Sequence, residues 1–142
     1  MEEIFLPLHF IALAFVAWNV FHADHMGFNW IQGKVEKLDA RTVEKYHKRT
    51  WIGLLLMIGT GVALFWPERE FLLARPQFYI KMAFVATLFL NSFAIGNLKE
   101  KSTTRAYASL SVRERIPLFL SGALSTISWL GAAVMALFLI PD

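Results

Sequence analysis

Six ionisable side chains lie within or beside long apolar stretches of this chain, and their types are suited to binding chemistry. They are His9, His22, Asp24, His25, His47 and Lys81. Ionisable groups inside a membrane are costly, and those that occur there usually serve a function. Neutral imidazoles bind transition metals and haem iron, whereas an ammonium group pairs with carboxylates or phosphates. These residue types therefore indicate a metal, a haem or an anionic ligand.

His9 and Lys81 are expected at similar depths. His9 lies about five residues into the first apolar stretch, ~7 Å deep, and Lys81 lies about three residues into the third, ~5 Å deep. Both depths are counted from the same membrane face, so the two side chains are predicted to meet in one half of a helical bundle. The alternative for Lys81 is snorkelling to nearby headgroups. The alternative for His9 is a hydrogen-bonded packing role.

A second group lies at the other end of the first apolar stretch. His22, Asp24 and His25 form a His-Ala-Asp-His segment, in which the two histidines share one helix face. His47 stands at a similar depth before the second stretch. These residues predict a site for a transition metal ion such as copper, zinc or iron. The alternative is a solvated collar of charge at the membrane interface.

The number of histidines limits how haem could bind. Two bis-histidine haems need four ligands paired across helices, and only His47 lies outside the first helix. A haem b on His9 would therefore be five-coordinate or use an unusual second ligand. Lys81, Arg49 and Arg75 are candidates for pairing with its propionates.

The composition indicates a membrane environment. Of the 142 residues, 56% are hydrophobic, and the mean hydropathy is +0.48. The chain has no cysteine, which excludes disulfides, thiolate metal sites and covalently attached haem. The net charge of +3 comes from basic residues that cluster beside apolar stretches. We interpret this excess of positive charge as an indication of how the chain is oriented in the membrane, and we expect no nucleic-acid partner.

Four apolar stretches are long enough to cross a bilayer, which takes ~20 residues. They cover residues 4–21, 51–66, 78–96 and 116–140. Asp39 is a plausible N-cap from which the second helix can start before Trp51, and Gly33 is an expected stop for the first helix. Pro67 is expected to end the second helix, and Pro117 to lie in the first turn of the fourth.

The basic residues predict the topology. Eleven of the fourteen Lys and Arg residues lie in the first and third connections: Lys34, Lys37, Arg41, Lys45, Lys48, Arg49, Lys99, Lys101, Arg105, Arg113 and Arg115. The positive-inside rule places both connections in the cytoplasm and both termini outside. Glu2 and Glu3 stand where a signal peptide carries basic residues, so the first stretch is expected to remain as a span. The prediction is an all-α, up-down four-helix bundle, one domain over residues 1–142, integral to a bacterial inner membrane.

Several short motifs resemble a known family of four-helix membrane proteins. They are Leu8-His9 and Ala17-Trp18, Lys48-Arg49-Thr50-Trp51, and Gln77-Phe78-Tyr79-Ile80-Lys81-Met82. The family contains the HemJ-type protoporphyrinogen oxidase and the copper-resistance D proteins. The resemblance implies a haem b or porphyrin in the bundle, with His9 as axial ligand and Lys81 near the site. The chain differs from the oxidase pattern at Asn91, where the oxidase carries histidine, and at Asn19, where it carries glycine.

Three functions follow from these observations. The first is a haem b protein, an oxidoreductase if it is an enzyme, acting on a porphyrin substrate or with an electron-transfer partner. The second is a transition-metal carrier or sensor that uses the histidines of the second group. The third is an accessory subunit of a larger membrane complex or homo-oligomer, whose apolar surface contacts the lipid bilayer and protein partners.

Overall fold

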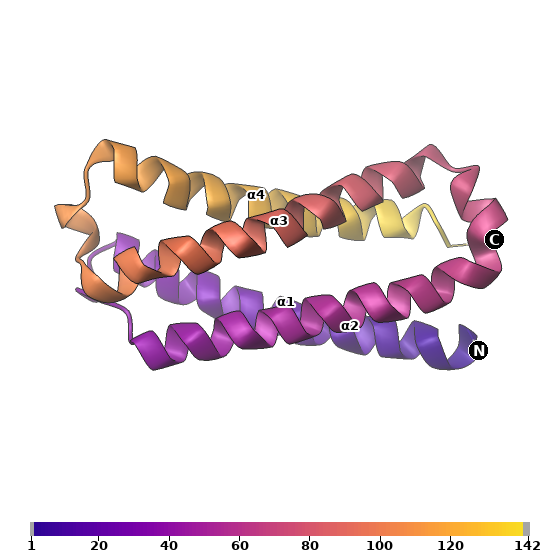
Figure 1. Ribbon diagram of the computed structural model, residues 1–142, viewed down its shortest axis with the longest axis horizontal. Coiled ribbons are helices and arrows are strands. Elements are labelled where there is room, and N and C mark those ends of the chain that lie inside the picture. The colour runs from indigo at the N-terminus through magenta and orange to yellow at the C-terminus, as the bar shows by residue number, and fades with distance from the viewer. Residues whose placement is uncertain (1, 141–142) are drawn as a thin grey trace.

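The computed structural model describes residues 2–140, which form four long α-helices (Figure 1). They are α1 (Glu2–Ile31), α2 (Ala40–Leu73), α3 (Pro76–Thr104) and α4 (Val112–Leu137), with a short 3-10 helix, η1 (Tyr107–Ser109), between α3 and α4. Each long helix has the length and apolar composition to cross a membrane. The predicted all-α, up-down arrangement of four candidate spans is confirmed.

Capping side chains explain where two of the helices begin. Asp39 caps α2 as predicted, because its carboxylate accepts hydrogen bonds from the Thr42 hydroxyl (2.6 Å) and backbone N–H (3.0 Å). These bonds hold the pKa of the Asp39 carboxyl below its usual range. α4 begins earlier than expected, because Ser111 and Glu114 form a capping box at its start. Pro117 therefore lies in the second turn of α4 and not in the first.

The second helix does not end at Pro67, contrary to expectation. α2 continues through Pro67 to Leu73. Proline removes one backbone hydrogen bond, but a long helix can continue beyond it with a kink. The helix ends instead just before Arg75, which has extended backbone (φ −103°, ψ 119°), as a residue that precedes proline prefers. Pro76 then opens α3.

The helices form two antiparallel hairpins. α1 packs along α2 and α3 packs along α4, while α2 and α3 join one hairpin to the other. The connection between α1 and α2 lies at the same end of the bundle as η1, and we call this the basic end. The N-terminus of α1, the C-terminal end of α4 and the turn between α2 and α3 lie at the opposite end (Figure 1).

Close approach within each hairpin depends on glycine. A Cβ atom on Gly53 of α2 would lie 2.1 Å from Cγ2 of Val16 in α1, and one on Gly131 of α4 would lie 2.5 Å from the Phe84 ring in α3. Val16 is fully buried. Small residues allow membrane helices to pack closely, and this packing is a main source of their association. Each hairpin is therefore a tightly packed unit.

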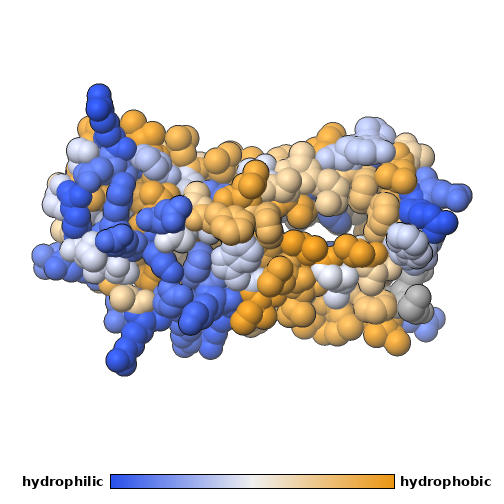
Figure 2. Space-filling view, viewed as in Figure 1, coloured by the Kyte–Doolittle hydropathy of each residue, from blue (hydrophilic) through white to orange (hydrophobic). Residues whose placement is uncertain are grey.

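The two hairpins are joined at the basic end. The Trp30 indole N–H donates to the Arg105 carbonyl oxygen at 3.0 Å. The Leu38 backbone N–H donates to the Ser102 carbonyl oxygen at 2.8 Å. The Trp30 ring also meets Tyr107 edge to face, with centroids 5.2 Å apart. Toward the opposite end, the space-filling view shows a small opening between the hairpins (Figure 2). At that end the hairpins are joined again by the turn between α2 and α3, where the Tyr79 hydroxyl donates to the Leu73 carbonyl oxygen at 3.0 Å.

The surface has the pattern expected in a bilayer. Apolar side chains cover the middle of the molecule, and hydrophilic ones gather at its two ends, above all at the basic end (Figure 2). Many of the exposed side chains in the middle are large and aliphatic or aromatic. The four candidate spans imply that this middle zone contacts lipid.

Replacing Gly53 with alanine is expected to destabilise the protein. The new methyl group would clash with Val16, a stiff and fully buried side chain, and overpacking of this kind costs ~1–3 kcal/mol. Circular dichroism of the detergent-purified variant should show a lower Tm. Gly59→Ala is the matched control, because no atom lies within 4 Å of a Cβ there. Equal Tm values for the two variants would contradict this account of the packing.

Candidate functional site

His9 of α1 is held by Thr60 of α2. The imidazole Nδ1 lies 2.7 Å from the Thr60 hydroxyl oxygen, and both side chains are partly buried. The Thr60 hydroxyl donates to the carbonyl oxygen of Leu56, one turn earlier in α2, also at 2.7 Å. A hydroxyl group has only one proton to donate. Thr60 therefore accepts a hydrogen bond from His9, and the imidazole carries its proton on Nδ1.

This hydrogen bond leaves Nε2 of His9 with a free lone pair. Histidine ligands in metal sites commonly have this arrangement, in which one ring nitrogen donates to an oxygen and the other binds the metal. Gly61 lies against the ring, since a Cβ there would be 3.6 Å from Cε1 of His9. α2 therefore orients the imidazole, and Nε2 is chemically able to bind a metal.

Lys81 approaches His9 from the other hairpin. It is a partly buried residue of α3, near enough for its positive charge to act on the imidazole. This effect does not establish a contact between the two side chains, and their meeting in one half of the bundle stays a prediction. In the part of the chain that the structure describes, neither of the two ion pairs involves Lys81. A cation in a membrane span calls for an anionic partner, so this position favours an anionic ligand.

Arg49 does not belong to the group around His9. It is exposed on α2, eleven residues before Thr60, which is ~16 Å along the helix axis. Arg75 also lies apart, in the turn between α2 and α3, with its guanidinium 4.5 Å from the centroid of the Phe71 ring. Of the three basic residues proposed for propionates, Lys81 is the one that the fold brings near His9.

His22 and His47 point to different neighbours. The His22 ring stacks on Tyr46 of α2, with centroids 6.0 Å apart, and its Nδ1 lies 2.8 Å from the Trp18 carbonyl oxygen. The His47 ring faces α3, where a Cβ on Gly96 would lie 3.5 Å from Nε2. Successive helical residues differ in direction by ~100°. Because Tyr46 is turned toward α1, His47 is turned toward α3.

The structure does not bring the second group together as a metal site. Asp24 and His25 are exposed on α1. Within residues 2–140, no three His, Asp or Glu side chains are close enough to hold a metal ion. The spacing of His22 and His25 correctly indicates a shared face of α1, but the sequence holds little information on how α2 is rotated against it.

Other polar contacts in the bundle are harder to detect in the sequence. Asn91 donates to the backbone carbonyl of Ser121, whose hydroxyl donates back to the Asn91 side-chain oxygen, both at 2.9 Å. Asn19 is 1% exposed, and its side-chain oxygen has no hydrogen-bond partner among the described residues. The contact from His9 to Thr60 joins residues 51 positions apart. A threonine between Gly59 and Gly61 is the sequence feature that could have indicated it.

Comparison with protein-family models, with curated proteins and with solved structures finds no match for this chain. Its class is therefore defined by its own structure. It is a four-helix protein in which every long helix is a candidate membrane span. Its distinguishing site is an oriented, partly buried histidine with a lysine from the other hairpin nearby.

The tautomer of His9 is expected to depend on Thr60. Nitrogen-15 NMR of histidine-labelled protein in micelles, at alkaline pH, should show His9 with a protonated Nδ1 and an unprotonated Nε2. Thr60→Val removes the acceptor and keeps the shape, so this preference should be lost. Thr87→Val is the control, because the Thr87 hydroxyl bonds to the Ala83 carbonyl within α3. A protonated Nε2 in the unmodified chain would contradict the assignment.

Proposed function

We propose that this chain is an integral membrane protein that binds haem b, or a related porphyrin, between its hairpins and uses it in oxidation or electron transfer. The observation that carries the proposal is the hydrogen-bond chain from His9 through Thr60 to Leu56, which leaves Nε2 of a partly buried imidazole as an available ligand atom. A neutral imidazole is the most common protein ligand of haem iron in globins and peroxidases. The donor at this position therefore fits the group.

Lys81 supports haem over a bare metal ion. A haem carries both an iron and propionate carboxylates, so one ligand would provide a partner for His9 and a partner for Lys81. A bare divalent cation would instead be repelled by the Lys81 ammonium group. The small opening between the hairpins is a place where a flat ligand could enter (Figure 2).

The chain's own contribution would be to orient and tune the cofactor. Haem b supplies one-electron redox chemistry when it is bound. Thr60 holds His9 in one tautomer, and a hydrogen bond of this kind raises the basicity of the ligand nitrogen. The positive charge of Lys81 near the iron would favour the reduced form. The apolar side chains of the four spans would exclude water from the site.

The resemblance to the HemJ-type oxidase supports a porphyrin ligand, and one of its departures bears on the reaction. Asn91 stands where that oxidase has a histidine, and here its side chain is fully engaged with Ser121. Asn91 therefore serves to join α3 to α4, and it offers no proton-accepting imidazole. This favours electron transfer over the oxidase reaction.

Removal of the His9 imidazole is expected to abolish haem binding. Protein produced with an ample haem supply and purified in detergent should show a Soret band and reducible α and β bands. His9→Ala should remove the Soret band, since the iron loses its ligand. Lys81→Met should lower the haem retained after washing by several-fold, because the propionate loses its partner. Both variants should still insert into the membrane.

Two exposed residues at the basic end provide matched controls. His25→Ala and Lys34→Met remove the same kinds of side chain far from His9 and should leave the Soret band unchanged. Size-exclusion chromatography and circular dichroism would show that every variant is folded. A colourless, iron-free protein with the unmodified sequence would overturn the proposal, as would an unchanged Soret band in His9→Ala.

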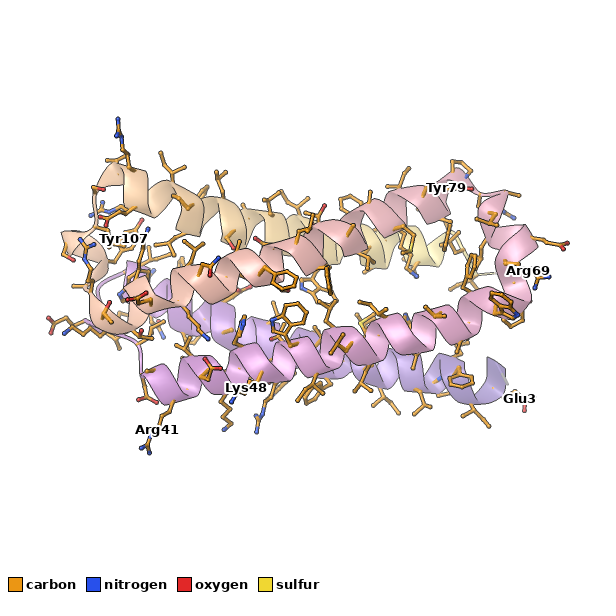
Figure 3. All side chains as sticks on the ribbon, viewed as in Figure 1. Glu3, Arg41, Lys48, Arg69, Tyr79 and Tyr107 are labelled. Atoms are coloured by element: carbon orange, nitrogen blue, oxygen red, sulfur yellow. The ribbon has the colours of Figure 1, made fainter. Side chains whose placement is uncertain are left out.

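We also propose that the basic end faces the cytoplasm of a bacterial inner membrane, with both termini outside. The fold brings the two basic connections to one end of the bundle, where Arg41, Lys48 and Tyr107 lie (Figure 3). At the other end, the last turns of α2 and the turn that follows carry two acidic and two basic side chains, which are Glu68, Glu70, Arg69 and Arg75. Such segregation is what the positive-inside rule relates to orientation.

Single cysteines can test this topology, because the chain has none of its own. In spheroplasts, a membrane-impermeant maleimide should label Glu70→Cys in the last turn of α2. The same reagent should label Lys34→Cys at the basic end only after the membrane is opened, since that end is expected inside. The reverse pattern of labelling would overturn the orientation.

A further inference from the structure

One side of α2 carries four exposed basic side chains near the start of the helix. They are Arg41, Lys45, Lys48 and Arg49. Lys45, Lys48 and Arg49 follow Arg41 by four, seven and eight residues, and this spacing places all four on a single helix face. Together with Ala40 and Glu44 they line an open hollow on the surface. Arg41 and Lys48 point away from the other helices (Figure 3). We call this surface the cationic face of α2.

The cationic face has a surplus of positive charge. Glu44 lies on it, but its carboxylate pairs with Lys99 of α3. Asp39 is engaged in capping Thr42. Among residues 2–140, neither of the two ion pairs includes any of the four cations of this face. No acidic residue lies in the first turn of α2. The four cations therefore offer positive charge to an external anion, and for Arg41, which lies in the first turn of α2, the helix dipole adds to that attraction.

The cationic face continues directly into an apolar stripe. Ile52, Leu55 and Leu56 lie on the same side of α2, and they are 54%, 57% and 52% exposed. α2 is 34 residues long, which is ~51 Å, whereas a bilayer core is ~30 Å thick. The apolar stripe thus matches the hydrocarbon level and the cationic face matches the headgroup level. An acidic protein segment would use only the cationic half of this surface.

We propose that this side of α2 is a binding site for an anionic phospholipid. The phosphate of its headgroup pairs with Lys45, Lys48 and Arg49, and its acyl chains lie along the apolar stripe. Zwitterionic lipids fit the stripe equally well but gain less at the cationic face, because they bring no net negative charge. Thr60 lies about three turns, ~16 Å, further along α2 than Arg49, so the headgroup part of this site is separated in depth from the proposed haem site.

Native mass spectrometry of detergent-purified protein can test this proposal. With equal amounts of phosphatidylglycerol and phosphatidylcholine, the unmodified chain should retain phosphatidylglycerol preferentially. The triple variant Lys45→Gln, Lys48→Gln, Arg49→Gln should lose about tenfold or more in its apparent affinity for phosphatidylglycerol, since each basic side chain near a membrane surface contributes substantially. Its affinity for phosphatidylcholine should stay unchanged.

The control has the same loss of charge at the same end of the molecule. Lys34→Gln, Lys37→Gln, Arg113→Gln removes three exposed cations that lie outside α2 or off its cationic face, and it should keep the preference. Three results would overturn the proposal: no preference in the unmodified chain, an equal loss in both triple variants, or an acidic protein that occupies the cationic face and excludes the lipid.

Discussion

The bilayer offers no water to hydrogen-bond polar groups, and this constraint governs most of the structure. Backbone groups are satisfied within the helices, so each polar side chain in a span must find a partner in the protein. Thr60 donates to its own helix and accepts from His9, and Asn91 and Ser121 satisfy each other. These contacts join helices as well as satisfying polar atoms. Against this background, the ammonium group of Lys81 and the buried side-chain oxygen of Asn19 stand out, because among the described residues Lys81 has no ion-pair partner and the Asn19 oxygen has no hydrogen-bond partner.

The asymmetry of the bundle follows from where its contacts lie. Within each hairpin, glycine lets two helices meet along their length, at Gly53 and at Gly131. Between the hairpins, contacts at the basic end come from connecting segments, because Trp30 and Leu38 bond to backbone carbonyls of the α3–α4 region. At the other end α2 passes directly into α3 through a short turn, the Tyr79 hydroxyl donates to the Leu73 carbonyl oxygen at 3.0 Å, and the Phe65 and Phe78 rings stack. The hairpins are therefore joined at both ends, and the small opening between them lies inside these two sets of contacts (Figure 2).

The sequence was sufficient for the number of spans, their up-down order and the Asp39 cap, because hydropathy, length and capping chemistry are local properties. The sequence was insufficient for helix ends at which two local signals compete. α2 continues through Pro67 despite the proline, and α4 begins at the Ser111 capping box, before Pro117. That His9 and Lys81 meet stays a prediction, which rests on depth along a helix because this depends on residue number alone. The relation of His22 to His47, and the contact of His9 with Thr60, depend on the rotation of α2 about its axis, which is set by packing at Gly53 and has no simple pattern in the sequence.

Both surfaces proposed for ligands lie on α2, and its position in the membrane connects them. The helix is much longer than a bilayer core is thick, so hydrophobic matching alone does not determine its depth. Basic side chains are held at the headgroup level, and Arg49 is the last of those that lie at the start of α2. Thr60 follows eleven residues later, ~16 Å further along the axis. Because Thr60 holds His9 by a hydrogen bond, the level at which these basic side chains are held also sets the depth of the imidazole.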